Sequence, residues 1–277
     1  MKTAVNRLRR RKRLCVAIGL VLLFTAACSR DPEARKRRFF ENGNQYFAKA
    51  DYRSAILEYR NAINIDARFG EARAQLAESY VKTGDLSNAL AEFVRAADLL
   101  PSDFDIQLKA GTLLLAANQP DQALVRADAA LKLRSQDISA LILRGNALAG
   151  LKSFDDALKS IEEAIRLEPD RGATFTQKGF IELAKGRREE AEQTFKYAIK
   201  LAPDAIEGYL ALGSYYWALG RPKEAEQTFH TALKIKPTDA VTNRALASLY
   251  LATARTSEAE QYLRTVADTS GDPVSAM

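Results

Sequence analysis

The stretch EARAQLAESYVKTGDLSNALAEFVRAADLLP, residues 71–101, decides the fold of this chain. Its pattern of small and large residues recurs at an unbroken period of 34 residues from Lys36 to Pro273, in seven copies. Gly or Ala stands at position 8 of every copy and Ala at position 20. A large apolar or aromatic residue stands at position 24 in all copies but the third, which has Ala127. A repeat of this length and pattern predicts stacked helix–turn–helix units.

The spacing has a simple physical reading. Positions 4, 7, 8 and 11 share one face of a first helix, and positions 20, 24 and 27 share one face of a second helix. Small residues at positions 8, 20 and 27 let the helices approach closely. Large residues at positions 11 and 24 are then expected to fill the space between one pair and the next. The sequence therefore predicts seven amphipathic helix pairs.

Turn and capping residues mark the predicted helix ends. Glycine at position 15 favours the left-handed conformation that ends a first helix. Proline after each of four second helices cannot continue a helix, and the Asp residues that follow are suited to cap the next one. The glycines are Gly84, Gly186 and Gly220, and the expected capping residues are Asp103, Asp170, Asp204 and Asp239.

With these landmarks in place, the chain resembles the tetratricopeptide-repeat family. The resemblance implies an all-α, right-handed superhelical solenoid of seven helix–turn–helix units that binds other proteins. The expected repeats are residues 36–69, 70–103, 104–137, 138–171, 172–205, 206–239 and 240–273, followed by a tail at 274–277.

The first 27 residues have the composition of an export signal. Seven basic residues between Lys2 and Arg13 precede an apolar run from Leu14 to Ala27. That run is shorter than a helix that crosses a membrane, which needs about 20 residues. Without this segment the net charge becomes +6 − 7 = −1, because it contains no acidic residue. The rest of the chain therefore lacks the excess of positive charge that is typical of a nucleic-acid-binding protein.

The sequence Thr25-Ala26-Ala27-Cys28 is similar to a bacterial lipobox. The resemblance implies cleavage before Cys28 and attachment of fatty acid, such as palmitate, to this cysteine. The alternative is an ordinary buried thiol at the end of an uncleaved anchor. Residues 28–35 would then form a lipidated tether, and Ser29 favours the outer membrane by resemblance to enterobacterial lipoproteins. The basic cluster 35–38 would lie near anionic headgroups or simply begin a solvated helix.

Catalytic chemistry finds no support in the sequence. His230 is the only histidine, and we expect it on the solvent side of a second helix. A catalytic triad or a histidine metal site needs partners that are missing. Acidic pairs such as Glu189-Glu190 and Asp155-Asp156 begin second helices, where they complement the helix dipole. We therefore expect no enzyme, no cofactor and no metal site.

The family resemblance places a protein-binding groove on the concave side, along the first helices. It implies a polar central row between apolar flanks that could hold an extended peptide, although apolar residues at position 12 are equally suited to packing between repeats. The Lys/Asn/Arg set of a carboxylate clamp is missing, so an acidic C-terminal tail is not expected as the ligand. The groove residues are Phe40, Asn44, Phe47, Glu78, Thr112, Asn146, Phe180, Ser214, Trp217 and Ser248.

Taken together, the sequence predicts a lipid-anchored interaction scaffold that faces the periplasm from the outer membrane. Its partner would be a protein or peptide of an envelope, secretion or polysaccharide-export assembly. The chain is similar to repeat lipoproteins of pilus assembly and barrel assembly, and to exosortase-associated repeat lipoproteins. The alternative is the N-terminal repeat region of a larger glycan-handling or transferase protein.

Overall fold

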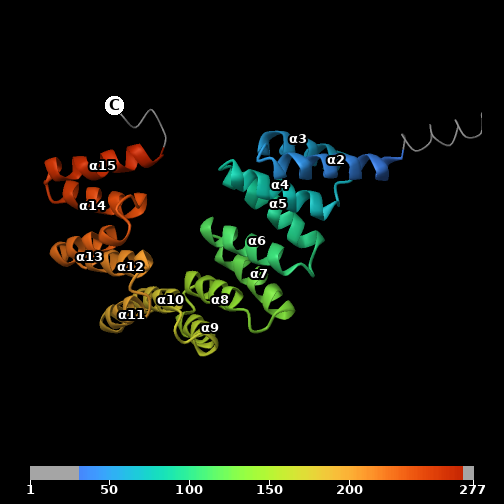
Figure 1. Ribbon diagram of the computed structural model, residues 1–277. Coiled ribbons are helices and arrows are strands. Elements are labelled where there is room, and N and C mark those ends of the chain that lie inside the picture. The colour runs from blue at the N-terminus through green and yellow to red at the C-terminus, as the bar shows by residue number, and fades with distance from the viewer. Residues whose placement is uncertain (1–30, 271–277) are drawn as a thin grey trace, which may run out of the picture. The chain divides into compact units, whose positions relative to one another are not determined.

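The computed structural model describes residues 31–270, and all secondary structure in this range is helical (Figure 1). Its fourteen helices form seven consecutive helix–turn–helix units. The helices are α2 (Pro32–Ala48), α3 (Tyr52–Ile65), α4 (Gly70–Lys82), α5 (Leu86–Leu99), α6 (Phe104–Ala116), α7 (Pro120–Leu133), α8 (Ile138–Gly150), α9 (Phe154–Leu167), α10 (Gly172–Ala184), α11 (Arg188–Leu201), α12 (Ile206–Ala218), α13 (Pro222–Ile235), α14 (Ala240–Ala252) and α15 (Thr256–Ser270).

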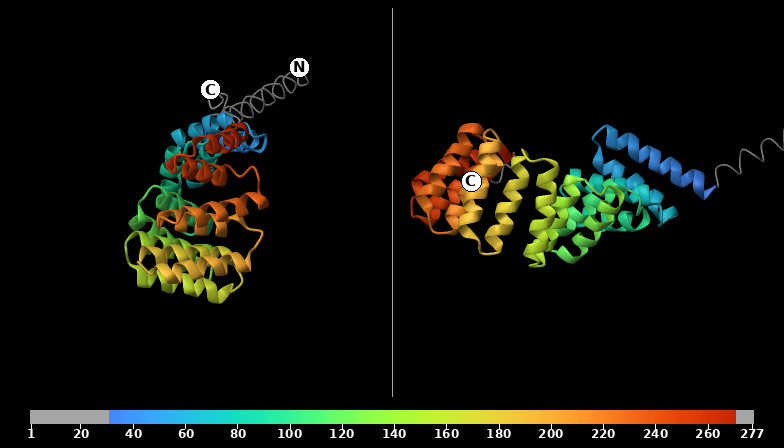
Figure 2. Two further views of the ribbon diagram at one scale, coloured as in Figure 1. Left: turned by 90° about the vertical axis from the view of Figure 1, so that its left-hand side faces the viewer. Right: turned by 90° about the horizontal axis from the view of Figure 1, so that it is seen from below.

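The chain divides into two compact units, one ending at Leu113 and the other beginning at Leu114. Within the first unit, α3 packs on both α2 and α4, and α4 packs on α5. Within the second unit, α8 to α14 each pack on the helix before and the helix after, and α15 packs on α14. The last pair, α14 and α15, lies side by side in every view (Figure 2). The all-helical fold predicted from the 34-residue period is therefore confirmed.

In four of the repeats, a glycine at position 8 packs against the large residue at position 24 and closes the helix pair. A Cβ atom built on Gly179 would lie 2.6 Å from Cε1 of Phe195, and one on Gly213 would lie 2.5 Å from Cε1 of Phe229. Both aromatic side chains are buried. The large residue at position 24 thus packs first against the glycine of its own repeat. This contact within the pair adds to the predicted packing between neighbouring pairs, which Phe195 also makes through its contact with Tyr215.

Position 15 has a left-handed backbone in all seven repeats, as its role in ending the first helix requires. Glycine occupies this position at Gly84, Gly186 and Gly220, with φ of 78°, 88° and 70°. The other four repeats place a residue with a side chain in the same conformation. These residues are Ala50, Asn118, Lys152 and Ala254, with φ between 57° and 62°.

Only some of the expected caps form. The Asp103 side chain accepts a hydrogen bond from Ile106 N, and that of Asp239 accepts one from Thr242 N. The predictions for Asp170 and Asp204 are wrong, because Arg171 and Ala205 occupy the N-cap positions and neither provides a side-chain cap. Asp170 and Asp204 stand one residue too early to reach the third amide of the helix.

The first helix is longer than its counterparts. It begins at Pro32, so residues 32–35 of the expected tether belong to α2, and Asp31 caps it through Glu33 N at 3.0 Å. The expected export signal, Cys28 and the 274–277 tail lie outside the described residues. None of the helices in residues 31–270 is long and apolar enough to span a membrane.

Candidate functional site

The side chains at positions 9 and 12 of the first helices form a face that we call the first-helix face. At position 9, the predicted residues Asn44, Thr112, Phe180, Ser214 and Ser248 are exposed, and Glu78 and Asn146 are half-buried. At position 12, Trp217 is exposed and Phe47 half-buried. Phe40, at position 5, is half-buried and packs against the core that contains Tyr59. Most of the predicted groove residues therefore remain accessible.

In the second unit, position 12 has two different roles. Leu183 packs against the core around Phe195, as the packing alternative predicted. Trp217 is 38% exposed and Leu251 is 49% exposed. Phe180, at position 9, is 41% exposed, although its ring contacts Phe195 edge-on at 5.1 Å. Because α10, α12 and α14 are neighbours, these residues provide large apolar side chains along one face.

In the first unit, the first-helix face is hollowed beside the Phe93 ring. One hollow of about 290 Å³ is lined by Val81, Leu108, Thr112 and Leu113; we call it the apolar hollow. A second, of about 230 Å³, we call the acidic hollow. Its lining includes Glu71, Ala74, Gln75, Leu100, Asp103, Asp105 and Ile106.

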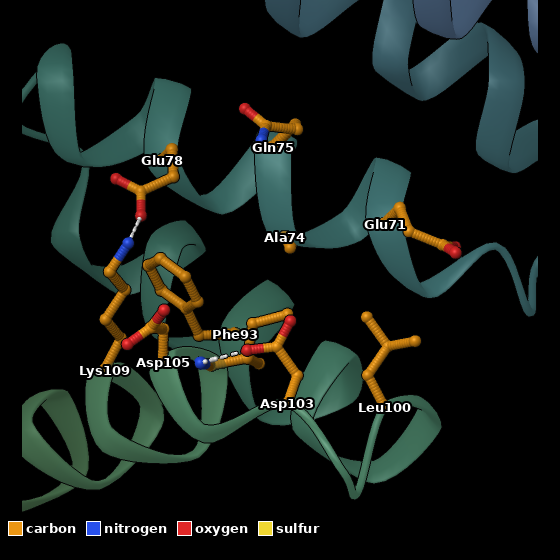
Figure 3. Close-up of a pocket in the computed structure, with 10 residues that line it drawn as sticks. Glu71, Ala74, Gln75, Glu78, Phe93, Leu100, Asp103, Asp105 and Lys109 are labelled. Carbon is orange, nitrogen blue, oxygen red and sulfur yellow. Dashed lines mark hydrogen bonds and ion pairs between the residues drawn. The ribbon is translucent and has the colours of Figure 1, made fainter.

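The wall between the two hollows is made by Glu78, Phe93 and Lys109, which line both. Figure 3 shows the Lys109 ammonium reaching from α6 to the Glu78 carboxylate on α4, with which it forms an ion pair. The Lys109 nitrogen lies 6.0 Å from the centre of the Phe93 ring. Glu78 was predicted as a groove residue from its repeat position, whereas Lys109 was missed because it stands at position 6.

The two asparagines of the central row differ in their hydrogen bonding. The Tyr59 hydroxyl donates to Asn44 Oδ1 at 2.8 Å, which occupies the amide acceptor of Asn44. Burial raises the pKa of Tyr59 to about 12, so this donor stays protonated at neutral pH. Asn146 has no such partner among the described residues, and both its donor and acceptor remain for a ligand. Only Asn146 therefore keeps the full pairing capacity predicted for a peptide backbone.

A network of charged and aromatic residues joins successive repeats in the second unit. Glu192 on α11 accepts hydrogen bonds from the Tyr216 hydroxyl at 3.0 Å and from Arg221 Nη1 at 2.8 Å. The Arg221 guanidinium lies 4.3 Å from the Tyr216 ring centre. Burial opposes ionisation of Glu192, but hydrogen bonds from Lys196, Arg221 and Tyr216 outweigh it and lower its pKa to about 2.

The same network recurs 34 residues later with histidine in the place of lysine. Glu226 accepts from Tyr250 at 2.8 Å and from Arg255 at 2.7 Å. His230 replaces Lys196 and lies 3.0 Å from the Tyr250 hydroxyl. His230 also contacts the ring of Tyr262, so its predicted position on the open solvent side is only partly right. Its contacts connect the sixth repeat with the seventh.

The comparisons with known proteins agree with this geometry. Two family models, both described as tetratricopeptide repeat, match residues 108–172, 182–241 and 216–276, together more than half of the chain. The chain belongs to the tetratricopeptide-repeat family. This membership gives it the general character of a protein-interaction scaffold. The comparison with curated proteins gave no match.

Solved structures of other tetratricopeptide-repeat proteins share the fold. A tetratricopeptide repeat protein of Parabacteroides merdae has 16% identity and a TM-score of 0.70, covering 86% of this chain and 94% of its own. A thermophilic repeat protein of Thermus thermophilus, TTC0263, has 23% identity and a TM-score of 0.57, covering 66% of this chain and 99% of its own. MamA of Desulfovibrio magneticus has 19% identity and a TM-score of 0.53, covering 60% of this chain and 94% of its own.

Residues 31–270 contain no group of three or more His, Cys, Asp or Glu side chains placed to hold a metal ion. Asp155 is paired with Lys185, and Asp156 accepts from Lys159 at 2.9 Å. Both acids lie in the first turn of α9, as predicted. The side chains on the first-helix face offer apolar contact, amide hydrogen bonding and charge pairing.

Proposed function

We propose that this chain is a non-enzymatic scaffold of the bacterial envelope, anchored by lipid at Cys28, which binds protein or peptide segments along its first-helix face. The observation that carries the binding proposal is the exposure of Phe180, Trp217 and Leu251 on neighbouring first helices. Exposed apolar residues that share one face favour a protein interface.

Site-specific crosslinking in the living bacterium tests this face. A photoreactive amino acid at Ser248, which is exposed on α14, should capture a defined envelope protein. The matched control places the same group at Val125, which is 63% exposed on second helix α7. The double substitution Trp217→Ala with Phe180→Ala should abolish the Ser248 crosslink. Equal capture from Ser248 and Val125 would contradict the assignment of the face.

The anchor is supported by the residues Thr25-Ala26-Ala27-Cys28 and tested separately. Metabolic labelling with an alkyne analogue of palmitate should mark the wild-type chain, and Cys28→Ser should abolish the label and release the chain from the membrane fraction. Unchanged labelling of Cys28→Ser would refute lipidation at this residue. Cys15→Ser, in the segment expected to be removed, serves as the matched control and should retain the label.

A further inference from the structure

The two hollows of the first unit differ in the charge and polarity of their linings. We propose that they select an extended segment with an aliphatic side chain and, two residues away, a lysine or arginine. This inference rests on the proposed function, because it assumes that the first-helix face binds extended peptides. It adds the chemistry that this part of the face recognises.

The charge of the acidic hollow favours a cationic side chain. Its lining contains four carboxylates, on Glu71, Glu78, Asp103 and Asp105, and one ammonium, on Lys109, which sum to −4 + 1 = −3. Glu78 is paired with Lys109, and Asp103 caps α6. Among the described residues of the first unit, no cationic side chain lies at ion-pair distance from Glu71 or Asp105. A lysine or arginine of a partner would supply the missing cation, and an acidic side chain would be repelled.

The apolar hollow favours an aliphatic side chain. Its walls are Val81, Leu108, Leu113 and the Phe93 ring, and Thr112 directs its hydroxyl to the backbone oxygen of Leu108 at 2.8 Å. Val81 is 37% exposed at the rim. Glu78 and Lys109 also line this hollow, but they are paired with each other. A polar side chain placed here would therefore lose water without gaining a free hydrogen-bond partner, whereas an aliphatic one buries surface on both sides.

The shared wall explains why one peptide can fill both hollows. Glu78, Phe93 and Lys109 line both hollows, so a ligand that fills the two places one side chain on either side of these residues. In an extended segment, residues i and i+2 point to the same side. The matching ligand therefore presents its aliphatic and its basic side chain at that spacing.

Three fluorescein-labelled nonapeptides test the preference. They share a Gly/Ser background and differ at the centre, which reads Leu-Ser-Arg, Leu-Ser-Glu or Ser-Ser-Arg. Fluorescence anisotropy with the full chain should show that Leu-Ser-Arg binds at least about tenfold more tightly than the other two. Its advantage over Leu-Ser-Glu should shrink as ionic strength rises, because salt screens the charge contribution. Equal affinities of the three peptides would overturn the proposal.

Charge reversal identifies the responsible residues. The double substitution Glu71→Lys with Asp105→Lys should reverse the order of Leu-Ser-Arg and Leu-Ser-Glu. Glu207→Lys is the matched control, because Glu207 is an exposed acid at the same repeat position 2, in the first turn of α12. Val81→Ser should weaken both leucine peptides and leave Ser-Ser-Arg unchanged. The same response from Glu207→Lys would place the effect outside the hollows.

The experiments distinguish failure of the peptide preference from failure of the proposed scaffold function. Indifferent peptide binding together with a Ser248 crosslink that depends on Trp217 would refute the preference and retain the scaffold. Loss of that dependence would refute the first-helix face as the binding surface, whichever peptide binds.

Discussion

Replacing Lys152 by glycine should stabilise the folded chain. Lys152 has φ of 62°, in the left-handed region, and its side chain is exposed, so no packing contact is lost. A residue with a Cβ atom costs about 1–2 kcal/mol in this conformation. Removing this strain stabilises the folded state, but the greater conformational freedom of glycine in the unfolded chain offsets about 0.5–1 kcal/mol of that stabilisation. The expected net increase in the free energy of unfolding is about 0.5–1 kcal/mol.

The assay is urea unfolding followed by circular dichroism in the far ultraviolet, where the helical signal is strong. Ala50→Gly and Ala254→Gly should give similar increases, since both residues are exposed with φ of 58° and 59°. The three positions lie in different repeats and share no contacts, so their effects should add to about 2 kcal/mol. Asn118→Gly should give a smaller increase, because asparagine tolerates the left-handed region better than other residues.

The reverse substitution gives the matched control. A Cβ atom added to Gly186 would have no neighbouring atom within 4 Å, so Gly186→Ala changes only the backbone preference. It should lower the free energy of unfolding by about the amount that Lys152→Gly raises it. A lower urea midpoint for Lys152→Gly, or an unchanged midpoint for Gly186→Ala, would refute the reasoning.

Three further predictions concern the helix contacts. Gly179→Ala should destabilise the chain by about 1–3 kcal/mol in thermal unfolding, because the new Cβ atom lies 2.6 Å from Phe195 Cε1 and overpacks the pair. Asp239→Ala should lower the free energy of unfolding by about 1 kcal/mol in urea, whereas Asp170→Ala should leave it unchanged, because only Asp239 caps a helix. The pKa of Glu192 is about 2 in the folded chain and about 4.3 in the unfolded chain, so its ionised form stabilises the fold. This contribution to the free energy of unfolding is fully present above about pH 5 and is lost as pH falls toward 2. In an acid titration, Glu192→Gln should therefore lose less stability than the wild type.

The fold was predictable because the 34-residue period fixes where each helix begins and which residues face each other within a helix pair. Every first helix from α4 onward begins at the first position of its predicted repeat, as Gly70 and Ile206 do. The small residue at position 8 and the large one at position 24 must face each other for the pair to close. Any chain with small and large residues at these positions therefore packs its helix pairs in the same way. The exception, α2, begins four residues early, because Asp31 and Pro32 together supply a good helix start.

The inter-repeat network was not predicted, although its signal is in the sequence. Glu192 and Glu226 stand 34 residues apart, as do Tyr216 and Tyr250. Tyr216 and Tyr250 stand at position 11, for which the pattern predicts only core filling. Glu192 and Glu226 stand at position 21, for which it predicts no role. Their partnership crosses from one repeat to the next, and periodicity within a single helix carries no information about such contacts.

Burial on the first-helix face, the proposed binding surface, also could not be predicted from repeat position. Leu183 and Trp217 both stand at position 12, yet Leu183 packs on the core and Trp217 is 38% exposed. The position fixes the direction of a side chain, whereas its burial depends on the side chains that the neighbouring repeats supply. Under the proposed function, specificity therefore lies in residues that the repeat pattern leaves free, such as Glu71 at position 2 and Lys109 at position 6. These residues set the charge beside the Phe93 ring, and exchanging them should change the ligand while leaving the helix pairs intact.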